Sequence, residues 1–282
     1  MRIGIALRST VFGPSLVAKL VPWVEESGFD SVWFPSVGRA FDALDMCGIS
    51  LGKSTRLNVG TGVIKYLDYD KEGLIARAHT LSEGSGGRFV LGIGTGSDTG
   101  GRAVERLVSY SDSLRSDYPR GPRLPIYFAA LKGKILRAAF LHADGAILNF
   151  CSSSYVRRIA AGRHAPGSFT LGCYIKLFFA KEDAVANKML AGEIRMYDAI
   201  PQYHRMFEQM GVAADLRNLD PRSIPDQLFE VSLANPSDQE VTSMLKGFSA
   251  AGVDLPILYP YVSGDEEYKR TIVKRLGACS SG

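Results

Sequence analysis

Short apolar runs alternate along the chain with longer segments that carry apolar residues on one side only. Runs of four to eight mostly apolar residues are typical of strands buried on both faces of a parallel sheet. Eight runs predict strands, at residues 2–7, 31–34, 56–64, 89–93, 125–129, 145–150, 169–179 and 255–259.

The segments between these runs predict helices, because their apolar residues recur at helical spacing. The first opens at Pro14 and ends at Gly28, with Pro22 expected to kink or split it. Gly84 is placed to cap the third, and Ser237 to cap the seventh. Residues 277–282 are expected to form a loose tail. The remaining helices are predicted at 41–51, 71–82, 101–116, 134–142, 154–161, 237–251 and 265–276.

Eight strand–helix units in about 250 residues favour a closed parallel barrel. We therefore predict an α/β fold, a (β/α)₈ TIM barrel, formed by residues 1–282 as one domain. Residues 183–233 are too long for one crossover helix and predict a helical insertion after the seventh strand. The alternative is a doubly wound open sheet, which more often has five to seven strands.

Composition narrows the class of partner. The 282 residues carry a net charge of +4, too small to indicate nucleic acid or an anionic membrane as a partner. The four cysteines, at 47, 151, 173 and 279, form no CxxC pair and indicate buried or inert thiols in a reducing compartment. With no signal-peptide pattern and no apolar run long enough to span a bilayer, we expect a cytoplasmic protein.

Several familiar motifs fail on spacing or context. Residues 48–55, GISLGKST, resemble a phosphate-binding P-loop, but the first glycine is one residue too close and the segment ends a helix. Residues 92–97, GIGTGS, lack the glycine spacing of a dinucleotide-binding loop. The four histidines are isolated, so we predict no metal site, and no GxSxG supports a serine hydrolase.

The glycines that follow the fourth strand run carry the strongest chemical signal. Gly92, Gly94 and Gly96 remove side chains at the carboxyl end of that strand, where a flat or phosphorylated ligand can approach the backbone. The alternative is that they only relieve crowding between strand and helix. In a barrel the site lies at these strand ends, so the positions of interest are Arg8, 35–39, 62–65, 94–98, 129–134, 149–152 and Lys176.

Three stretches resemble one known family. They are RLNVGTGVI (56–64), LSEGSGGRFVLGIGTG (81–96) and LPIYFAALKGKILRAAFLHADGAILNF (124–150). Together they are similar to the bacterial luciferase-like superfamily of flavin- and deazaflavin-dependent enzymes. Within it, the chain most resembles the methylene-tetrahydromethanopterin reductases, which use coenzyme F-420.

The resemblance implies a cofactor at the carboxyl end of the barrel, above a non-prolyl cis peptide at Gly62–Val63. It places the cofactor phosphate near the loops after the fourth and fifth strands. Lys132 and Lys134 start a helix, where a bound anion would favour them and where they are otherwise merely tolerated. The cofactor-binding residues that we expect are Gly62, Val63, Lys65, Thr95, Gly96, Leu131, Lys132, Lys134 and Ile135.

The chain departs from the family at its acid–base positions. Ser36 and Val37 stand where many deazaflavin enzymes carry an Asp-His pair, Ser97 where some carry Glu, and Arg8 where a carboxylate is common. Without a base for a hydroxyl proton, hydride transfer to an already activated acceptor is favoured over sugar-phosphate or alcohol oxidation. Arg8, Ser36 and Ser97 are then the polar groups expected to face the substrate.

Three hypotheses follow. The first is a coenzyme F-420-dependent oxidoreductase acting on a small organic substrate. The second is an FMN-dependent monooxygenase that uses reduced flavin and O₂, and the third is a non-catalytic ligand-binding barrel. A homodimer is expected from the resemblance, with Leu44, Cys47 and Leu74 able either to form an interface or to pack on the barrel.

Overall fold

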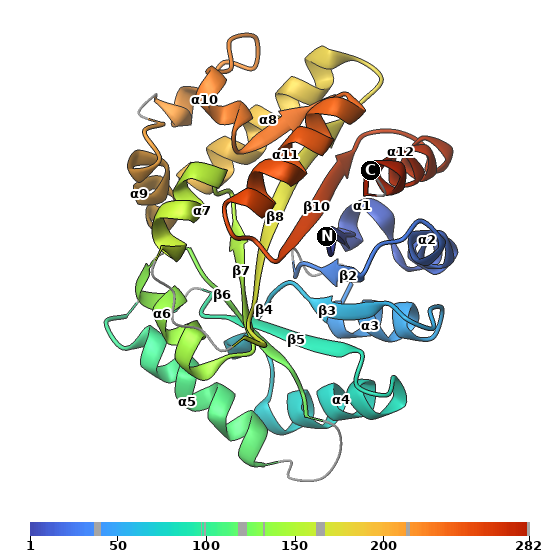
Figure 1. The fold of residues 1–282 in the computed structure, drawn as a ribbon, viewed down its shortest axis with the longest axis vertical. Helices are drawn as coiled ribbons and strands as arrows, with labels where there is room; N and C mark the ends of the chain where they lie inside the picture. The colour runs from blue at the N-terminus through green and yellow to red at the C-terminus, as the bar shows by residue number, and fades with distance from the viewer. Residues whose placement is uncertain are drawn as a thin grey trace.

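The computed structural model describes residues 1–36, 41–96, 98, 100–117, 123–131, 133–161, 167–212 and 215–280. Eight parallel strands close into a barrel surrounded by helices, as the sequence predicts (Figure 1). The barrel strands are β1 (Gly4–Ala6), β2 (Ser31–Phe34), β3 (Asn58–Thr61), β5 (Phe89–Gly94), β6 (Ile126–Ala129), β7 (Gly145–Asn149), β8 (Thr170–Phe179) and β10 (Leu255–Val262).

The ring is closed by β10, which pairs in parallel with both β1 and β8. Register places Tyr259 beside Lys176, and Asn149 beside Tyr174. Because side chains two residues apart on a strand point the same way, Tyr174 and Lys176 lie on one face of β8. This register fixes which side chains meet inside the barrel near its carboxyl end.

The predicted third strand is divided in two. β3 ends at Thr61, and the two-residue strand β4 (Ile64–Lys65) pairs with β5 instead. The peptide bond between them, Gly62–Val63, is cis, as the family resemblance implies. A short helix η1 (Tyr66–Asp68) follows.

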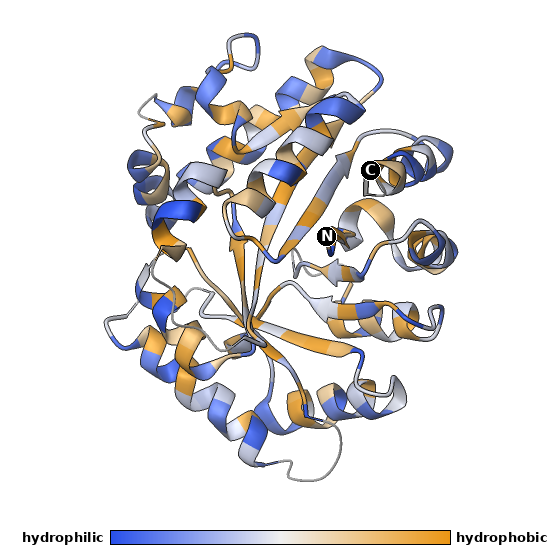
Figure 2. Ribbon diagram, in the orientation of Figure 1, coloured by the Kyte–Doolittle hydropathy of each residue, from blue (hydrophilic) through white to orange (hydrophobic). Residues whose placement is uncertain are grey.

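Helices cover the outside of the barrel and place their polar faces toward solvent, whereas the strands form an apolar centre (Figure 2). Leu44, Cys47 and Leu74 are buried within the chain, so they pack on the barrel and offer no exposed interface; the homodimer stays a prediction. The covering helices are α1 (Ser9–Phe12), α2 (Pro14–Glu26), α3 (Ala43–Leu51), α4 (Lys71–Gly84), α5 (Ala103–Ser116), α6 (Gly133–His142), α7 (Ser153–Ala160), α11 (Asp238–Ala250) and α12 (Glu266–Ser280).

Three local predictions are wrong. α2 continues through Pro22 as one helix and is not split. Gly84 lies inside α4, and Ser85 is the C-cap; the reversal that follows uses Gly86 and Gly87 at positive φ. The expected loose tail is helical to Ser280, because Leu276 and Cys279 are buried and fix the last turns of α12.

The insertion after β8 is largely helical, as predicted, and adds one strand. It contains α8 (Asp183–Asp198), α9 (Pro201–Gln209), η2 (Leu216–Asn218), α10 (Asp226–Phe229) and β9 (Ser232–Ala234). β9 pairs with the end of β8 and so holds the insertion to the barrel rim.

Ser237 caps α11 in a reciprocal arrangement. Its hydroxyl accepts from the Glu240 backbone N–H (3.3 Å), and the Glu240 carboxylate accepts from the Ser237 N–H (2.8 Å). Ser237→Ala is therefore expected to lower the free energy of unfolding by about 1 kcal/mol in urea titrations. Ser243→Ala, an exposed position on the same helix, is the control, and an equal loss there would show that capping is not the cause.

All four cysteine thiols are free and buried, as the sequence indicates. Burial raises the pKa of Cys151 to about 12, so this thiol stays protonated at neutral pH. Among the described residues, no helix combines the length and apolarity that crossing a membrane requires.

Candidate functional site

A cavity of about 1000 Å³ opens at the carboxyl ends of the barrel strands. This is the end at which barrel enzymes place their sites, and the size suits a cofactor together with a small substrate. It is lined by residues 35, 36, 62, 63, 65, 94–96, 98, 100, 101, 103, 104, 129–131, 134, 135, 147, 149, 174, 197, 199–203, 205 and 259.

Most of the residues predicted from sequence lie on this cavity. The structure brings together Ser36, Gly62, Val63, Lys65, Thr95, Gly96, Leu131, Lys134 and Ile135. Arg8 is not among the lining residues: its guanidinium lies 3.6 Å from Glu193 and 5.1 Å from the ring centre of Tyr261. Ser97, Lys132 and Val37 lie outside the described residues.

One wall of the cavity is the backbone around Gly62. The Tyr174 hydroxyl donates to the Gly62 carbonyl (2.5 Å), and a Cβ at Gly62 would stand 1.8 Å from that hydroxyl oxygen. A Cβ at Gly94 would meet Val63 Cγ2 at 3.0 Å, and Gly96 has a φ of +57°. The glycines here therefore let the backbone of the wall lie close to neighbouring side chains, beyond relieving contacts with a helix.

Charged groups gather at the glycine-loop side of the cavity. Lys65 and Lys134 line it, whereas the carboxylate of Asp98 is paired with Arg106 through Nε at 2.8 Å and through a second, shorter bond. The hydrogen bonds from Arg106 lower the pKa of Asp98, which therefore stays ionised and paired. Lys134 can meet an anion, and Lys65 can turn to one as well, because its pair with Asp68, at 4.0 Å, is exposed to solvent.

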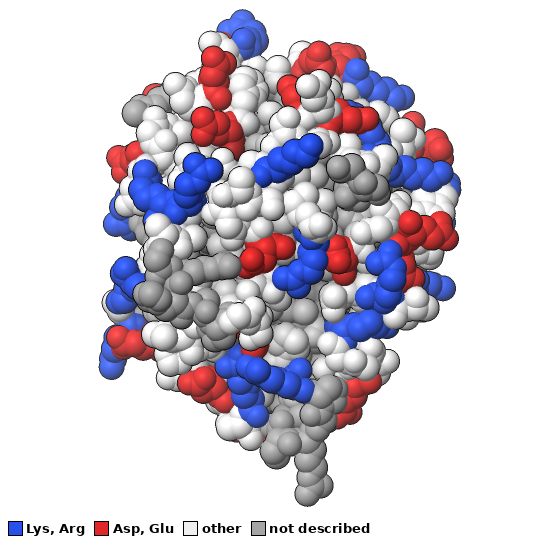
Figure 3. Space-filling view, viewed as in Figure 1, with Lys and Arg blue, Asp and Glu red and all other residues white. Residues whose placement is uncertain are grey.

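Across the molecular face seen in Figure 3, blue cationic and red anionic groups are interspersed, as expected for a small net charge. Among the described residues, no group of three or more His, Cys, Asp or Glu side chains could hold a metal ion.

Tyrosines and Asn149 form the opposite side of the cavity. Asn149 Nδ2 donates to the Tyr203 hydroxyl (2.8 Å), but its Oδ1 has no partner among the described residues. Tyr174, Tyr197 and Tyr259 complete this side, the first and last with ring centres 5.1 Å apart. These hydroxyl and amide groups can orient an uncharged polar substrate.

Lys176 of β8 is completely buried. It lies behind the tyrosines at 174, 197, 203 and 259, which we call the tyrosine wall. Its ammonium is 3.0 Å from Glu193 Oε1 on α8 and 3.0 Å from the Tyr261 hydroxyl on β10. It also lies 3.9 Å from the ring centre of Phe150 and 4.1 Å from that of Tyr197. The aromatic rings and one carboxylate thus replace the water that a lysine normally keeps.

Protonation in this cluster follows from burial and pairing. Burial lowers the pKa of Lys176 to about 7, although the Glu193 carboxylate opposes the change. Burial opposes ionisation of Glu193 too, but Lys176 and then Tyr261 hold the pKa of its carboxyl below the usual value. Glu193 is therefore ionised at neutral pH, whereas Lys176 titrates there.

The lowered pKa of Lys176 predicts a pH dependence of stability. From pH 7 upward to the unfolded value of 10.5, the unfolded chain binds a proton that the folded chain lacks, so this group favours folding more as pH rises. Relative to Lys176→Met, the wild type should gain roughly 2 kcal/mol of unfolding free energy between pH 7 and pH 9 in urea titrations. A constant difference across that range would show that Lys176 does not titrate there.

Part of the cavity lining could be predicted from the ends of the strands. The sequence placed Asp98, Asn149 and Lys176 at strand ends without a role for them, and it missed the tyrosines at 174, 197, 203 and 259. Tyr174 and Tyr259 lie within predicted strands, so alternation along a strand could have marked their faces. No sequence signal brings Glu193 of the insertion to Lys176.

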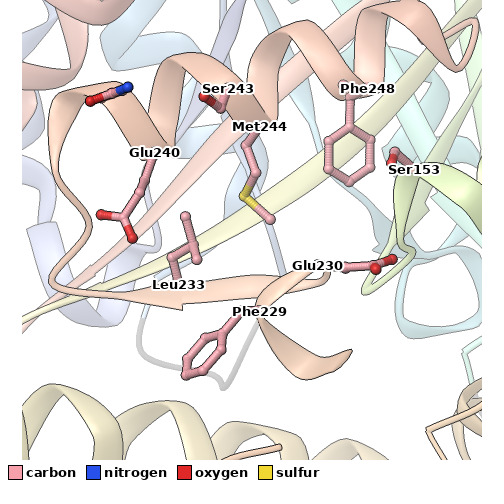
Figure 4. A pocket seen from close by; sticks show the side chains of 10 residues that line it. Ser153, Phe229, Glu230, Leu233, Glu240, Ser243, Met244 and Phe248 are labelled. Carbon is pink, nitrogen blue, oxygen red and sulfur yellow. The ribbon is translucent and has the colours of Figure 1, made fainter. Parts of the chain in front are cut away.

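A second hollow, of about 390 Å³, lies between α11, β9 and the start of α7 (Figure 4). Phe229, Leu233, Met244 and Phe248 make it mainly apolar, with Glu230 and Glu240 at its edges. It holds no cluster of reactive groups and stands apart from the barrel end, so the larger cavity is the candidate site.

Comparison with known protein families gives a match in the first part of the chain. Residues 1–108 match the family described as luciferase-like monooxygenase. They contain β1 to β5 and the first part of α5, including Gly62–Val63 and the glycine loop of the cavity.

The chain also has curated relatives. The chain is 36% identical over 105 residues to the F-420-dependent glucose-6-phosphate dehydrogenase of Nakamurella multipartita. That match covers 34% of this chain and 31% of the relative, so it spans about a third of the length of the curated protein.

Solved structures of other proteins share the fold over nearly the whole chain. The coenzyme F-420-dependent tetrahydromethanopterin reductase of Methanopyrus kandleri has a TM-score of 0.70 at 15% identity, covering 98% of this chain and 97% of that one. The 3,6-diketocamphane monooxygenase component from Pseudomonas putida, in complex with FMN, has a TM-score of 0.67 at 15% identity, covering 99% and 97%. At these identities the likeness establishes the barrel fold.

Proposed function

We propose that the chain is a coenzyme F-420-dependent oxidoreductase that transfers hydride to or from a small organic substrate. The observation that carries the proposal is the flat wall at Gly62 and Val63, which lies in one cavity with two lysines and a set of tyrosine hydroxyls. The identity of residues in the matched segment to an F-420-dependent enzyme supports the same cofactor.

The described residues fit such a cofactor in shape. Gly62 and the small side chain of Val63 offer a surface for a flat ring, and Cβ atoms at Gly62 or Gly94 would intrude on close neighbours. Thr95, Gly96, Leu131 and Ile135 would surround the cofactor side chain, as the resemblance implies.

The described residues fit it in charge as well. Lys65 and Lys134 would meet its anionic groups, because Asp98 is already neutralised by Arg106. Ser97 keeps the substrate-facing role, and Lys132 the cofactor-binding role, that the sequence suggests. Arg8 lies beside Glu193 and acts on the site through that carboxylate.

The bound deazaflavin supplies a two-electron hydride donor or acceptor, which is chemistry that no side chain provides. The protein contributes binding, orientation and exclusion of water. Ile200 and Gln202 of the insertion line the cavity opposite the glycine loop, so the insertion shapes the substrate region. Ser36 and the tyrosine wall are the groups left to contact the substrate.

FMN-dependent oxygen chemistry is the second candidate, favoured by the likeness in fold to the FMN-containing monooxygenase component. Anaerobic assays with reduced coenzyme F-420 and methylene blue, which needs only a hydride, test the first function directly. Oxygen uptake with supplied reduced FMN tests the second. Turnover above the protein-free rate in the first assay alone supports the proposal, turnover in the second alone replaces it, and none in either favours a ligand-binding barrel.

A further inference from the structure

We propose that Tyr259 is the proton donor of this site and that Lys176 resupplies the proton through Tyr261. The substrate class is then a carbonyl compound or a conjugated enone, reduced by hydride and proton together. This inference rests on the proposed function. It provides a source of protons in a cavity whose described lining residues include no histidine and one carboxylate, Asp98, which is paired with Arg106.

Tyr259 has the position that a donor needs. Its side chain lines the cavity although the residue is only 2% exposed. Its ring centre is 5.1 Å from that of Tyr174, whose hydroxyl holds the Gly62 carbonyl. The phenol therefore stands next to the wall on which the cofactor ring is expected to lie.

The Tyr259 hydroxyl is buried, and a ligand that reached it would have no hydrogen bond to a described residue to displace. It has no hydrogen-bond partner of good geometry among the described residues, and the Tyr261 hydroxyl is its polar neighbour. Burial, and then the Tyr197 hydroxyl, raise the pKa of Tyr259 above its usual value. The group is thus a neutral phenol that can donate a proton and is not a phenolate that takes one.

Proton-bearing groups lie next to Tyr259. Tyr259 and Tyr261 are stacked with ring centres 4.7 Å apart. The Tyr261 hydroxyl donates to Glu193 Oε1 (2.5 Å) and accepts from the Lys176 ammonium (3.0 Å). Arg8 lies 3.6 Å from the other oxygen of Glu193, so the carboxylate is balanced by two cations and stays ionised.

The step balances in atoms and charge. The electrophilic carbon of the substrate would take a hydride, with its electron pair, from the bound reduced cofactor; the π electrons would move to oxygen, and Tyr259 would give its proton to that oxygen. Tyr261 turns its proton from Glu193 toward the Tyr259 phenolate and receives one from Lys176. The net donor is the Lys176 ammonium, which becomes a neutral amine and regains its proton from solvent between turnovers.

The test compares two acceptors under anaerobic conditions with reduced coenzyme F-420. 2-Cyclohexen-1-one needs both hydride and proton, whereas methylene blue, already a cation, needs hydride alone. Tyr259→Phe should lower enone reduction roughly 100-fold with little change in methylene blue reduction or in cofactor affinity by fluorescence. Tyr110→Phe, which removes a hydroxyl on α5 outside the cavity, is the control and should leave both reductions unchanged.

A second readout needs neither substrate nor cofactor. In protein labelled with ¹³Cε-lysine, the Lys176 resonance, assigned by its loss in Lys176→Met, should titrate near pH 7. Tyr261→Phe should move that midpoint, because the hydroxyl that bridges Lys176 to Tyr259 is removed. An unchanged midpoint overturns the relay from Lys176.

The acceptor assay distinguishes the two proposals. Equal loss on both acceptors, no loss on either, or a wild type that reduces methylene blue but no enone overturns Tyr259 as donor. A wild type that binds no coenzyme F-420 overturns the proposed function, and with it the role of Tyr259 in reduction.

Discussion

Replacing Gly62 with alanine is expected to weaken the binding of coenzyme F-420 by roughly 100-fold, about 2.7 kcal/mol. A Cβ at this position would stand 1.8 Å from the Tyr174 hydroxyl oxygen and 3.4 Å from Trp33 Cβ. Tyr174 cannot swing freely, because it is buried against Tyr259 and its hydroxyl is bonded to the Gly62 carbonyl. The wall must therefore shift toward the cavity, where the cofactor ring is expected to rest.

A second variant removes the Tyr174 hydroxyl oxygen, which an added Cβ at Gly62 would meet first. Tyr174→Phe deletes the hydroxyl, and the next nearest atom to the added Cβ, Tyr174 Cζ, lies at 3.1 Å. Gly62→Ala combined with Tyr174→Phe should regain part of the affinity in fluorescence titrations. Gly84→Ala, at a helical position with open space, controls for the methyl group itself. Unaltered affinity in Gly62→Ala would contradict the assigned cofactor wall.

The second large effect is on stability. Glu193→Leu removes the carboxylate from Lys176, which is completely buried and keeps only the Tyr261 hydroxyl and aromatic rings as neighbours. Breaking a buried pair costs about 3–5 kcal/mol of unfolding free energy, because an uncompensated charge stays behind. The loss should be largest at pH 6 and smaller at pH 9, where Lys176 is neutral in the folded chain.

A double variant separates charge from packing. Lys176→Met with Glu193→Leu removes both charges and should be more stable than Glu193→Leu alone, since apolar replacement of a buried pair is often close to neutral. Arg8 then loses its partner at 3.6 Å, but its side chain is 17% exposed and can meet water. If urea titrations place the double variant below Glu193→Leu, the pair stabilises through packing and not through compensation of charge.

The barrel was largely predictable because its signals are local. Each strand run, such as residues 31–34, is apolar throughout and bounded by turn residues, so periodicity located it directly. The end of the chain was mispredicted because small residues at 277–280 suggest a loop, whereas burial of Cys279 keeps them in α12. Tertiary packing overrode local propensity there.

The cavity was predictable on its glycine side and not on its tyrosine side. The sequence indicates Gly62, Gly94 and Gly96 because glycines remove side chains at strand ends, and the family resemblance points to the same region. The cluster of Lys176, Glu193 and Tyr261 depends on how α8 crosses the barrel end, which no spacing in the sequence encodes. For the same reason Arg8 was expected at the substrate and instead lies beside Glu193.

The most direct measurement is a fluorescence titration of the purified protein with coenzyme F-420 and, separately, with FMN. We expect saturable binding of the deazaflavin, weaker binding of FMN, and loss of the deazaflavin signal in Gly62→Ala. Preference for FMN, or binding of neither cofactor, would contradict the claim that this cavity serves deazaflavin-dependent hydride transfer.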